Sequence, residues 1–232
     1  MSAARVRRGI ALALLAGAIA GFLGLGIWQL ERRSWKLALI AHTEQQLRSA
    51  PTPAPGPAAW AGIDRDDVYR PVIATGRYLP GRDTLVQAVT ELGGGFWVMT
   101  PLQATGFTVL VNRGFVPADA RGRIGPPPPG EVRVRGLLRV SEPEGGFLRS
   151  NDPAAGRWYS RDVAAIARAG RLSGVAPYFV DAAASRTSGW PRGGLTVVRF
   201  RNSHLSYALT WFAMAALFAW LGWRVTRRHA SD

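Results

Sequence analysis

Two long uncharged stretches limit what this chain can fold into. Residues 9–30 read GIALALLAGAIAGFLGLGIWQL and residues 205–223 read LSYALTWFAMAALFAWLGW, with no charged side chain in either. At a helical rise of about 1.5 Å per residue, each stretch is long enough to cross a bilayer core of roughly 30 Å. Together they predict a two-helix membrane hairpin that leaves both chain ends on one side.

The first stretch follows the basic segment ARVRR, a beginning that secretory signal peptides share. Signal cores usually run about 7 to 15 apolar residues and end at a small-residue cleavage site. Here the apolar stretch is longer and continues into GIWQLERRSWK. We therefore favour an uncleaved anchor over a cleaved signal.

The net charge of +14 constrains partners more than orientation. Arginines flank both ends of both stretches, so the charge bias does not fix the orientation. A long intervening segment is translocated largely regardless of charge, which favours chain ends in the cytoplasm.

Residues 31–203 hold 23 Lys and Arg against 14 Asp and Glu, a net charge of +9. That surface suits anionic headgroups or an acidic ligand, although a solvated arginine-rich surface explains most of these residues singly. Nucleic acid is not an expected partner, because the domain between the two stretches is expected to lie on the outer side of the membrane.

The chain has no cysteine, which excludes disulfides, thiolate metal sites, iron–sulfur clusters and cysteine nucleophiles. It also lacks the G-x-S-x-G and H-E-x-x-H motifs and a phosphate-binding loop. We therefore expect that the protein is not an enzyme. If it were one, Asp162 and Arg113 would be the polar residues to inspect first, although Asp162 is rather expected to support the start of the helix that follows it.

The segment between the two stretches changes texture along its length. Residues 31–50 have helical spacing and continue the first helix, and the proline-dense PTPAPGPAA then predicts a linker. From Tyr69 onward, short runs rich in Val, Thr and aromatic residues alternate with turn signals, as in antiparallel strands. Ser160 is expected to cap one helix, RDVAAIARA, that Gly170 ends.

The predicted fold class is an α+β membrane protein, in which a transmembrane hairpin carries a small, mainly antiparallel β domain with one or two helices. The expected boundaries are as follows: residues 1–30 for the N-terminal end and first transmembrane helix, 31–50 for its helical extension, 51–68 for the proline-rich linker, 69–203 for the extracytoplasmic β-rich domain, 204–223 for the second transmembrane helix and 224–232 for a basic cytoplasmic tail.

Helical spacing separates the faces of the two apolar stretches. Gly17, Gly21 and Gly24 fall on one stripe of the first stretch, and such small residues allow helices to approach closely in lipid. In the second stretch, Leu205, Leu209, Leu217 and Leu221 lie on one face, which suits lipid. The opposite face alternates small and aromatic residues and suits a partner helix or a flat ligand; it comprises His204, Tyr207, Ala208, Trp211, Ala215, Phe218, Ala219 and Gly222.

His204 lies where a polar segment meets the second apolar stretch, and two interpretations remain open. Residue type alone favours an interfacial histidine among the aromatic side chains that membrane boundaries collect. The other interpretation is a metal or haem ligand, because a neutral imidazole can donate a lone pair to iron. In that case Trp28, Tyr207 and Trp211 would line the haem, and arginines at the same depth would pair with its propionates. The arginine candidates are Arg32, Arg199 and Arg201.

Six segments resemble the surfeit locus protein 1 family, whose members are assembly factors of haem–copper terminal oxidases. Their order and spacing agree with the family as well as their content, and the resemblance covers nearly the whole chain. The segments are GIWQLERRSWK at 26–36, YRPVIATGRYLP at 69–80, VNRGFVP at 111–117, RWYSRDV at 157–163, GWPRGG at 189–194 and RNSHLSYALTWF at 201–212.

The resemblance implies a role in cytochrome oxidase biogenesis in which the protein binds haem a and helps to insert it into the catalytic subunit. It maps the candidate iron ligand of the family onto His204. Tyr207, Trp211, Trp28, Arg32 and Arg201 are the further expected haem-contacting residues. Ser203 stands where asparagine is common and Ser206 where glutamine is common, which affects the hydrogen bonding around the ligand more than ligation.

The expected partners are the oxidase catalytic subunit and the lipid bilayer, with a haem a synthase as a further candidate. The expected location is a bacterial inner membrane, with the globular domain on the periplasmic side. A haem-free alternative remains: the β domain and the glycine stripe would dock an oxidase subunit during assembly, and His204 would only pack.

Overall fold

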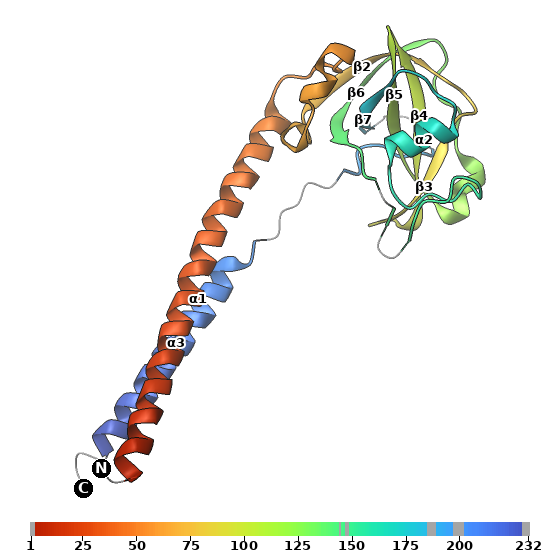
Figure 1. Cartoon of the computed structure of the whole chain (residues 1–232). Helices are drawn as coiled ribbons and strands as arrows, with labels where there is room; N and C mark the ends of the chain where they lie inside the picture. Colours follow the sequence, from red (N-terminus) through yellow and green to blue (C-terminus); the bar gives the residue numbers. More distant parts are fainter. Residues whose placement is uncertain (1–2, 144, 147–148, 185–188, 197–201, 229–232) are drawn as a thin grey trace. The chain divides into compact units, whose positions relative to one another are not determined.

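The computed structural model of the chain describes residues 3–143, 145–146, 149–184, 189–196 and 202–228. It divides into two compact units. One unit comprises Met1–Thr43 and Arg199–Asp232, and the other comprises Glu44–Val198. Figure 1 labels their helices and strands.

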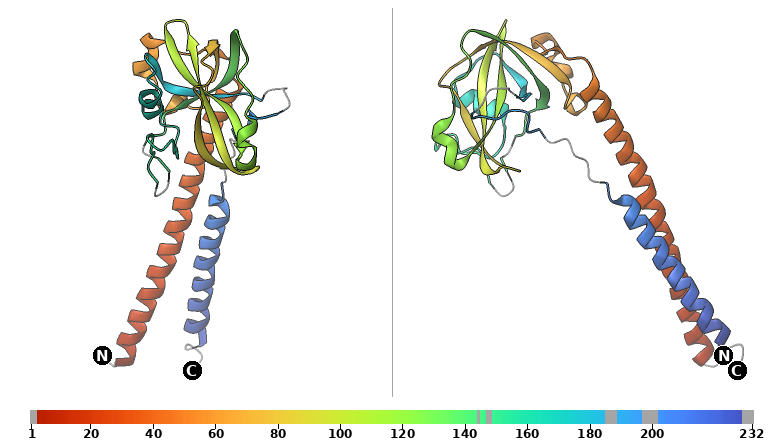
Figure 2. Two further views of the ribbon diagram at one scale, coloured as in Figure 1. Left: turned by 90° about the vertical axis from the view of Figure 1, so that its right-hand side faces the viewer. Right: turned by 180° about the vertical axis from the view of Figure 1, so that it is seen from behind.

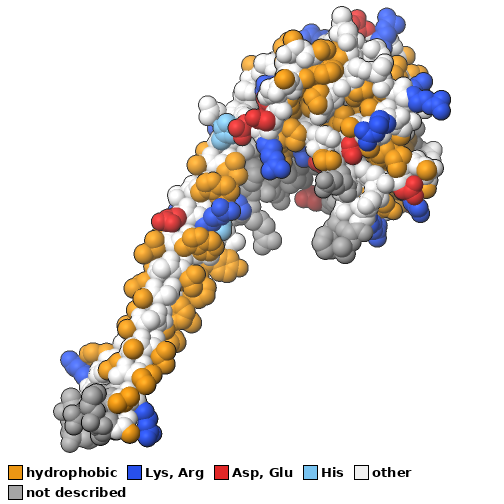
Figure 3. All heavy atoms as spheres, in the orientation of Figure 1, with side chains coloured by type: hydrophobic (Ala, Val, Ile, Leu, Met, Phe, Trp, Pro, Cys, Tyr) orange, Lys and Arg blue, Asp and Glu red, His pale blue; other side chains and the backbone are white. Residues whose placement is uncertain are grey.

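Two long helices form the first unit. Helix α1 spans Ala3–Arg48 and helix α3 spans His204–Arg228, and the two lie side by side and run in opposite directions (Figures 1 and 2). Both are long and apolar enough to cross a membrane, and hydrophobic side chains cover them along their length (Figure 3). The chain has no proline before Pro51, so no proline interrupts α1. Helix α3 continues to Arg228, five residues beyond the predicted end of the second stretch.

The helices meet along a seam of small and aromatic side chains. Gly26 and Gly222 leave room for the Phe212 ring and the Leu15 side chain, which a Cβ atom at either glycine would overlap. Phe22 stacks on Trp211 with ring centroids 5.8 Å apart and meets Phe218 edge-on at 5.2 Å. Close backbone approach at small residues is how apolar helices associate in the absence of a hydrophobic driving force.

The predicted glycine stripe does not make this contact. A Cβ atom at Gly17, Gly21 or Gly24 would meet nothing within 4 Å. The contact with α3 runs instead through Gly26, which spacing did not single out. The leucine face of α3 agrees with the prediction: its members are among the exposed apolar side chains, namely Leu205, Leu209, Leu217 and Leu221.

The second unit is a barrel-like sheet of seven strands in the order β1-β2-β6-β7-β5-β4-β3. An additional pairing of β2 with β4 closes β2, β6, β7, β5 and β4 into a ring. Most neighbours are antiparallel, whereas β1 with β2 and β5 with β7 are parallel. The strands are β1 (Thr52–Pro53), β2 (Pro71–Tyr78), β3 (Thr84–Thr90), β4 (Gly93–Ala104), β5 (Phe107–Pro117), β6 (Glu131–Val140) and β7 (Val175–Ala182).

Gly76 makes the closure possible. It pairs with Val132 of β6 and with Ala104 of β4, so β2 has a neighbouring strand on both edges here. A Cβ atom here would overlap the carbonyl of Gln103. Glycine at such a corner permits the backbone approach that a closed sheet requires.

Alternate side chains of the ring strands fill its interior. This pattern places apolar residues of period two on the inside, as strand geometry dictates. Burying such side chains contributes about 25 cal/mol per Å² of apolar surface removed from water. The interior cluster comprises Val72, Ala74, Leu102, Phe107, Val109, Val111, Leu138, Ala176, Tyr178 and Val180.

Two local expectations differ from the structure. The proline-rich segment 51–68 packs on the barrel. Proline excludes an α-helix there but allows the short 3₁₀ turns at Pro57–Gly62 and Arg65–Asp67. Trp60 packs against the barrel interior cluster, so this segment is not a free linker. A further 3₁₀ turn spans Ala118–Arg123.

The short helix α2 spans Val163–Ala169, and its cap is not the expected one. The Asp162 carboxylate accepts a hydrogen bond from the Ala165 amide at 3.0 Å, which gives this residue a structural role. Ser160 instead accepts hydrogen bonds from the Gly145 amide and the Asn151 side chain. Gly170 ends the helix as predicted.

A buried ion network ties β6, β7 and the loop before α2 together. The Asp181 carboxylate is 3% exposed and accepts hydrogen bonds from Arg139 at 3.1 Å and Arg161 at 3.2 Å. Asn112 and Thr196 donate to it as well, at 2.8 and 3.1 Å. Burial lowers the pKa of Arg161, but Asp181 and Glu142 stabilise its charged form, and the net result is a raised pKa.

We expect Asp181→Asn to destabilise the barrel strongly, by about 3 to 5 kcal/mol, because it removes the buried one of the two carboxylates that Arg139 and Arg161 share. Glu142→Gln is the control, since that carboxylate is 37% exposed and water can replace it. Thermal unfolding of the full chain, followed by the β-sheet circular dichroism signal, measures both. Equal shifts in the two variants would contradict the central role of Asp181.

Candidate functional site

His204 is the first residue of α3. Its amide lies 3.4 Å from the Asn202 side-chain oxygen, and the Ser203 carbonyl accepts from the Tyr207 amide at 3.2 Å and from the Ser206 hydroxyl at 2.9 Å. These contacts satisfy backbone groups at the helix start. The two serines that depart from the usual motif therefore bond to each other and leave the imidazole to other partners.

The imidazole bonds across the seam to Gln29 of α1. The distance from His204 Nδ1 to Gln29 Oε1 is 2.7 Å, and the histidine is partly exposed. An amide oxygen can only accept a hydrogen bond, so this contact places the proton on Nδ1. In the neutral ring the lone pair is then on Nε2, which is the state that a metal-binding imidazole needs.

Sequence reasoning missed Gln29, although a signal was present. Gln29 is the one residue of the apolar stretch 9–30 with a hydrogen-bonding side chain other than the Trp28 indole. Polar side chains in membrane-length helices usually face another helix or a cavity, where a partner satisfies them. Which partner Gln29 meets depends on the register of α3, which spacing within one helix does not reveal.

The other predicted residues separate into two groups. Trp211 belongs to the seam, where Phe22 covers its ring. Trp28 and Tyr207 are 52% and 57% exposed, and the Arg32 guanidinium lies 4.0 Å above the Trp35 ring. Arg201, like Arg199, lies outside the described residues.

Tyr207 lies beside the seam, whereas Trp28 and Arg32 lie on another face of α1. Tyr207 comes one position before the buried Ala208. At about 100° per residue, Trp28 is about 160° and Arg32 about 120° around α1 from Gly26, the residue that contacts α3. Tyr207 and Trp211 are therefore the predicted residues that share a side of α3 with His204.

The seam below His204 is filled by the Phe22 and Trp211 rings, so a haem would fit the surface of the helix pair better than its interior. Among the described residues, no group of three or more His, Cys, Asp or Glu side chains could hold a bare metal ion. A single imidazole suits a macrocycle that brings its own four nitrogen donors.

Comparison with known proteins covers both units. The SURF1 family matches residues 16–216, from within α1 to within α3. Surfeit locus protein 1 of Homo sapiens is 36% identical over 225 residues, which is 85% of this chain and 71% of the human protein. The protein of Rattus norvegicus is 35% identical over 226 residues, covering 87% and 71%, and a SURF1-like protein of Monosiga brevicollis is 36% identical over 228 residues, covering 90% and 84%.

A match of this extent spans Gly26, the closed sheet and the start of α3. Identity above 30% over most of both chains supports the same conclusion. The chain belongs to the SURF1 family.

Proposed function

We propose that this chain is an assembly factor for a haem–copper terminal oxidase of the cytochrome c oxidase type, and that it holds haem a for insertion into the catalytic subunit. The hydrogen bond from His204 to Gln29 carries the proposal, because it leaves Nε2 of an imidazole available for iron. Family membership and the motif that contains His204 support it.

The setting of this function is a membrane. The two apolar helices would form a transmembrane hairpin with both chain ends in the cytoplasm, and the barrel would lie on the periplasmic side of a bacterial inner membrane. The exposed leucines of α3 support lipid contact on the face away from α1. The catalytic subunit, itself expected in the bilayer, would be the main partner, and a haem a synthase is the natural donor.

His204 would bind the iron through Nε2, and Gln29 would hold the ring in that tautomer. Haem supplies an iron atom with an open axial position for such a nitrogen. Trp28 and Tyr207 would contact the porphyrin plane, and Arg32, with Arg201, would neutralise propionates. One imidazole ligand keeps the transfer simple, because the protein gives up a single bond to iron. None of these roles requires catalysis.

His204→Ala should remove most of the bound haem a from protein purified out of a haem a-producing strain, because Nε2 is the proposed donor. Pigment content per chain, from the visible absorption spectrum and extraction, measures this. His42→Ala is the matched control, since His42 belongs to α1 outside the seam contact with α3. Equal haem in wild type and His204→Ala would remove the ligand assignment.

Gln29→Leu should release the fixed tautomer without unfolding the hairpin. In haem-free protein labelled with ¹⁵N-histidine, nitrogen chemical shifts report which ring nitrogen carries the proton. We expect Nδ1–H in the wild type and in Gln29→Glu, whose carboxylate still accepts, and a mixture in Gln29→Leu. A wild-type ring protonated at Nε2 would contradict the positioning role of Gln29, whatever the haem content.

A haem-free scaffold is the second candidate, and the glycine stripe favours it. The open space at Gly17, Gly21 and Gly24 leaves this face of α1 available to a helix of an oxidase subunit. In this case His204 would only join α1 to α3.

The scaffold predicts a specific pattern of crosslinks to the catalytic subunit. Gly21→Leu should abolish them, because the added side chain fills the open face, whereas His204→Ala should preserve them. Gly26→Leu is the contrasting variant, since it disturbs the contact with Phe212 inside the hairpin instead. Crosslinks that survive Gly21→Leu would exclude docking through the stripe.

A further inference from the structure

A groove of about 1040 Å³ opens in the barrel unit, outside the histidine site. Strand β6 forms one wall through Val132–Arg135, and Pro126–Pro129 and Trp190 lie among its other lining residues. The recorded pairing of β6 with β7 covers Gly136–Val140, so this part of β6 lies beyond the end of β7. Ala182–Ala184, where β7 ends, line the groove as well.

Three arginines line the groove, and none of its described lining residues is acidic. Arg133 and Arg135 are exposed and occupy alternate positions of β6, so both side chains lie on one face of the strand, about 6.6 Å apart along it. Neither guanidinium forms an ion pair with a described carboxylate. Glu131 shares this face but does not line the groove. It lies opposite Arg77 of β2 in the strand register.

Arg113 adds a buried positive charge to the groove. Its side chain is 9% exposed, and its Nη2 donates to the Gly125 carbonyl at 2.6 Å. Its Nη1 is buried without a hydrogen bond and lies 3.7 Å from the Asp83 carboxylate. Burial lowers the pKa of Arg113, and Asp83 only partly offsets this, so the charge is under-compensated.

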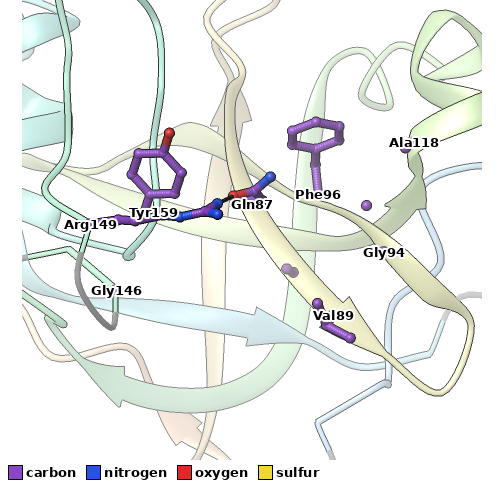
Figure 4. A pocket seen from close by; sticks show the side chains of 10 residues that line it. Gln87, Val89, Gly94, Phe96, Ala118, Gly146, Arg149 and Tyr159 are labelled. Carbon is purple, nitrogen blue, oxygen red and sulfur yellow. Dashed lines mark hydrogen bonds between the residues drawn. The ribbon is translucent and has the colours of Figure 1, made fainter.

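In a second hollow of the same unit, an arginine has both a hydrogen-bond acceptor and an aromatic ring as partners. The hollow has a volume of about 560 Å³, and Figure 4 shows Arg149 joined there to Gln87 beside the Tyr159 ring. The Arg149 Nη1 donates to the Gln87 amide oxygen at 3.1 Å, and the guanidinium lies 5.4 Å from the Tyr159 ring centre. The larger groove offers its strand arginines no such partner among the described residues.

We propose that this groove binds an extended acidic segment of a partner polypeptide. Alternate positions of an extended segment face the same way, so carboxylates two residues apart match the spacing of Arg133 and Arg135. Val132, Val134 and Trp190 provide apolar surface for the side chains between them. The groove is far larger than a single small anion, and strand edges are a recurrent site for extended peptides.

The test uses the full chain in phosphatidylcholine nanodiscs and a fluorescein-labelled peptide, Glu-Val-Glu-Val-Glu. Fluorescence anisotropy gives its Kd. Arg133→Gln/Arg135→Gln should weaken binding about tenfold or more, because it removes two charge-assisted contacts. Arg65→Gln/Arg168→Gln, which removes the same net charge from exposed sites elsewhere in the barrel unit, should change Kd by about twofold at most. Unchanged melting temperatures confirm that both double variants fold.

The peptide Gln-Val-Gln-Val-Gln supplies the second comparison and should bind about tenfold more weakly than the acidic one. Three results would overturn the proposal. They are no measurable binding of the acidic peptide, equal weakening in both double variants, and full displacement of the peptide by millimolar glutarate or inorganic phosphate. The last result would assign the arginines to a small anion instead.

Discussion

Close contact between two apolar helices positions every described residue of the histidine site. Both helices are long and apolar enough to cross a membrane, and there apolar surfaces would gain nothing by leaving solvent, so packing of small against aromatic side chains would have to hold them together. Gly26 and Gly222 supply that packing here. Their placement sets the register of α3 against α1, and the register in turn brings His204 to Gln29. The chemistry of the imidazole is thus a consequence of helix packing several residues away.

Much of the architecture follows from the sequence, because it rests on local patterns. Uncharged length predicted α1 and α3, alternation and turn residues predicted the strands, and the leucines of α3 identified its exposed face. The contact through Gly26 did not follow from spacing, since a single helix offers several small-residue faces and only the partner selects one. Gln29 and the closure of the sheet at Gly76 escaped prediction for the same reason. Both depend on segments that are far apart along the chain.

The folding of segment 51–68 shows a different limit. Proline density excludes a regular helix, but it does not say whether the chain stays in solvent or packs on a neighbour. Trp60 decides the matter by packing against the barrel interior. Ser160 and Asp162 illustrate the same ambiguity at short range, since either side chain can cap a helix and the loop that contains Asn151 competes for the serine.

Buried and exposed charges of the barrel unit have different roles. The buried Asp181 carboxylate accepts hydrogen bonds from two arginines and two neutral donors, and these bonds connect neighbouring strands. Arg133 and Arg135 lie on exposed strand positions instead, where a charge costs little while it remains hydrated. The first arrangement serves the fold, and the second keeps its electrostatic attraction for a binding partner.

The bond to Gln29 also makes the two jobs of His204 chemically separable. Nδ1 makes the contact with the amide oxygen, and Nε2 takes no part in it. A group bound at Nε2 could therefore leave while the link between α1 and α3 stayed intact. Release of a ligand from this ring does not require the helices that present it to part.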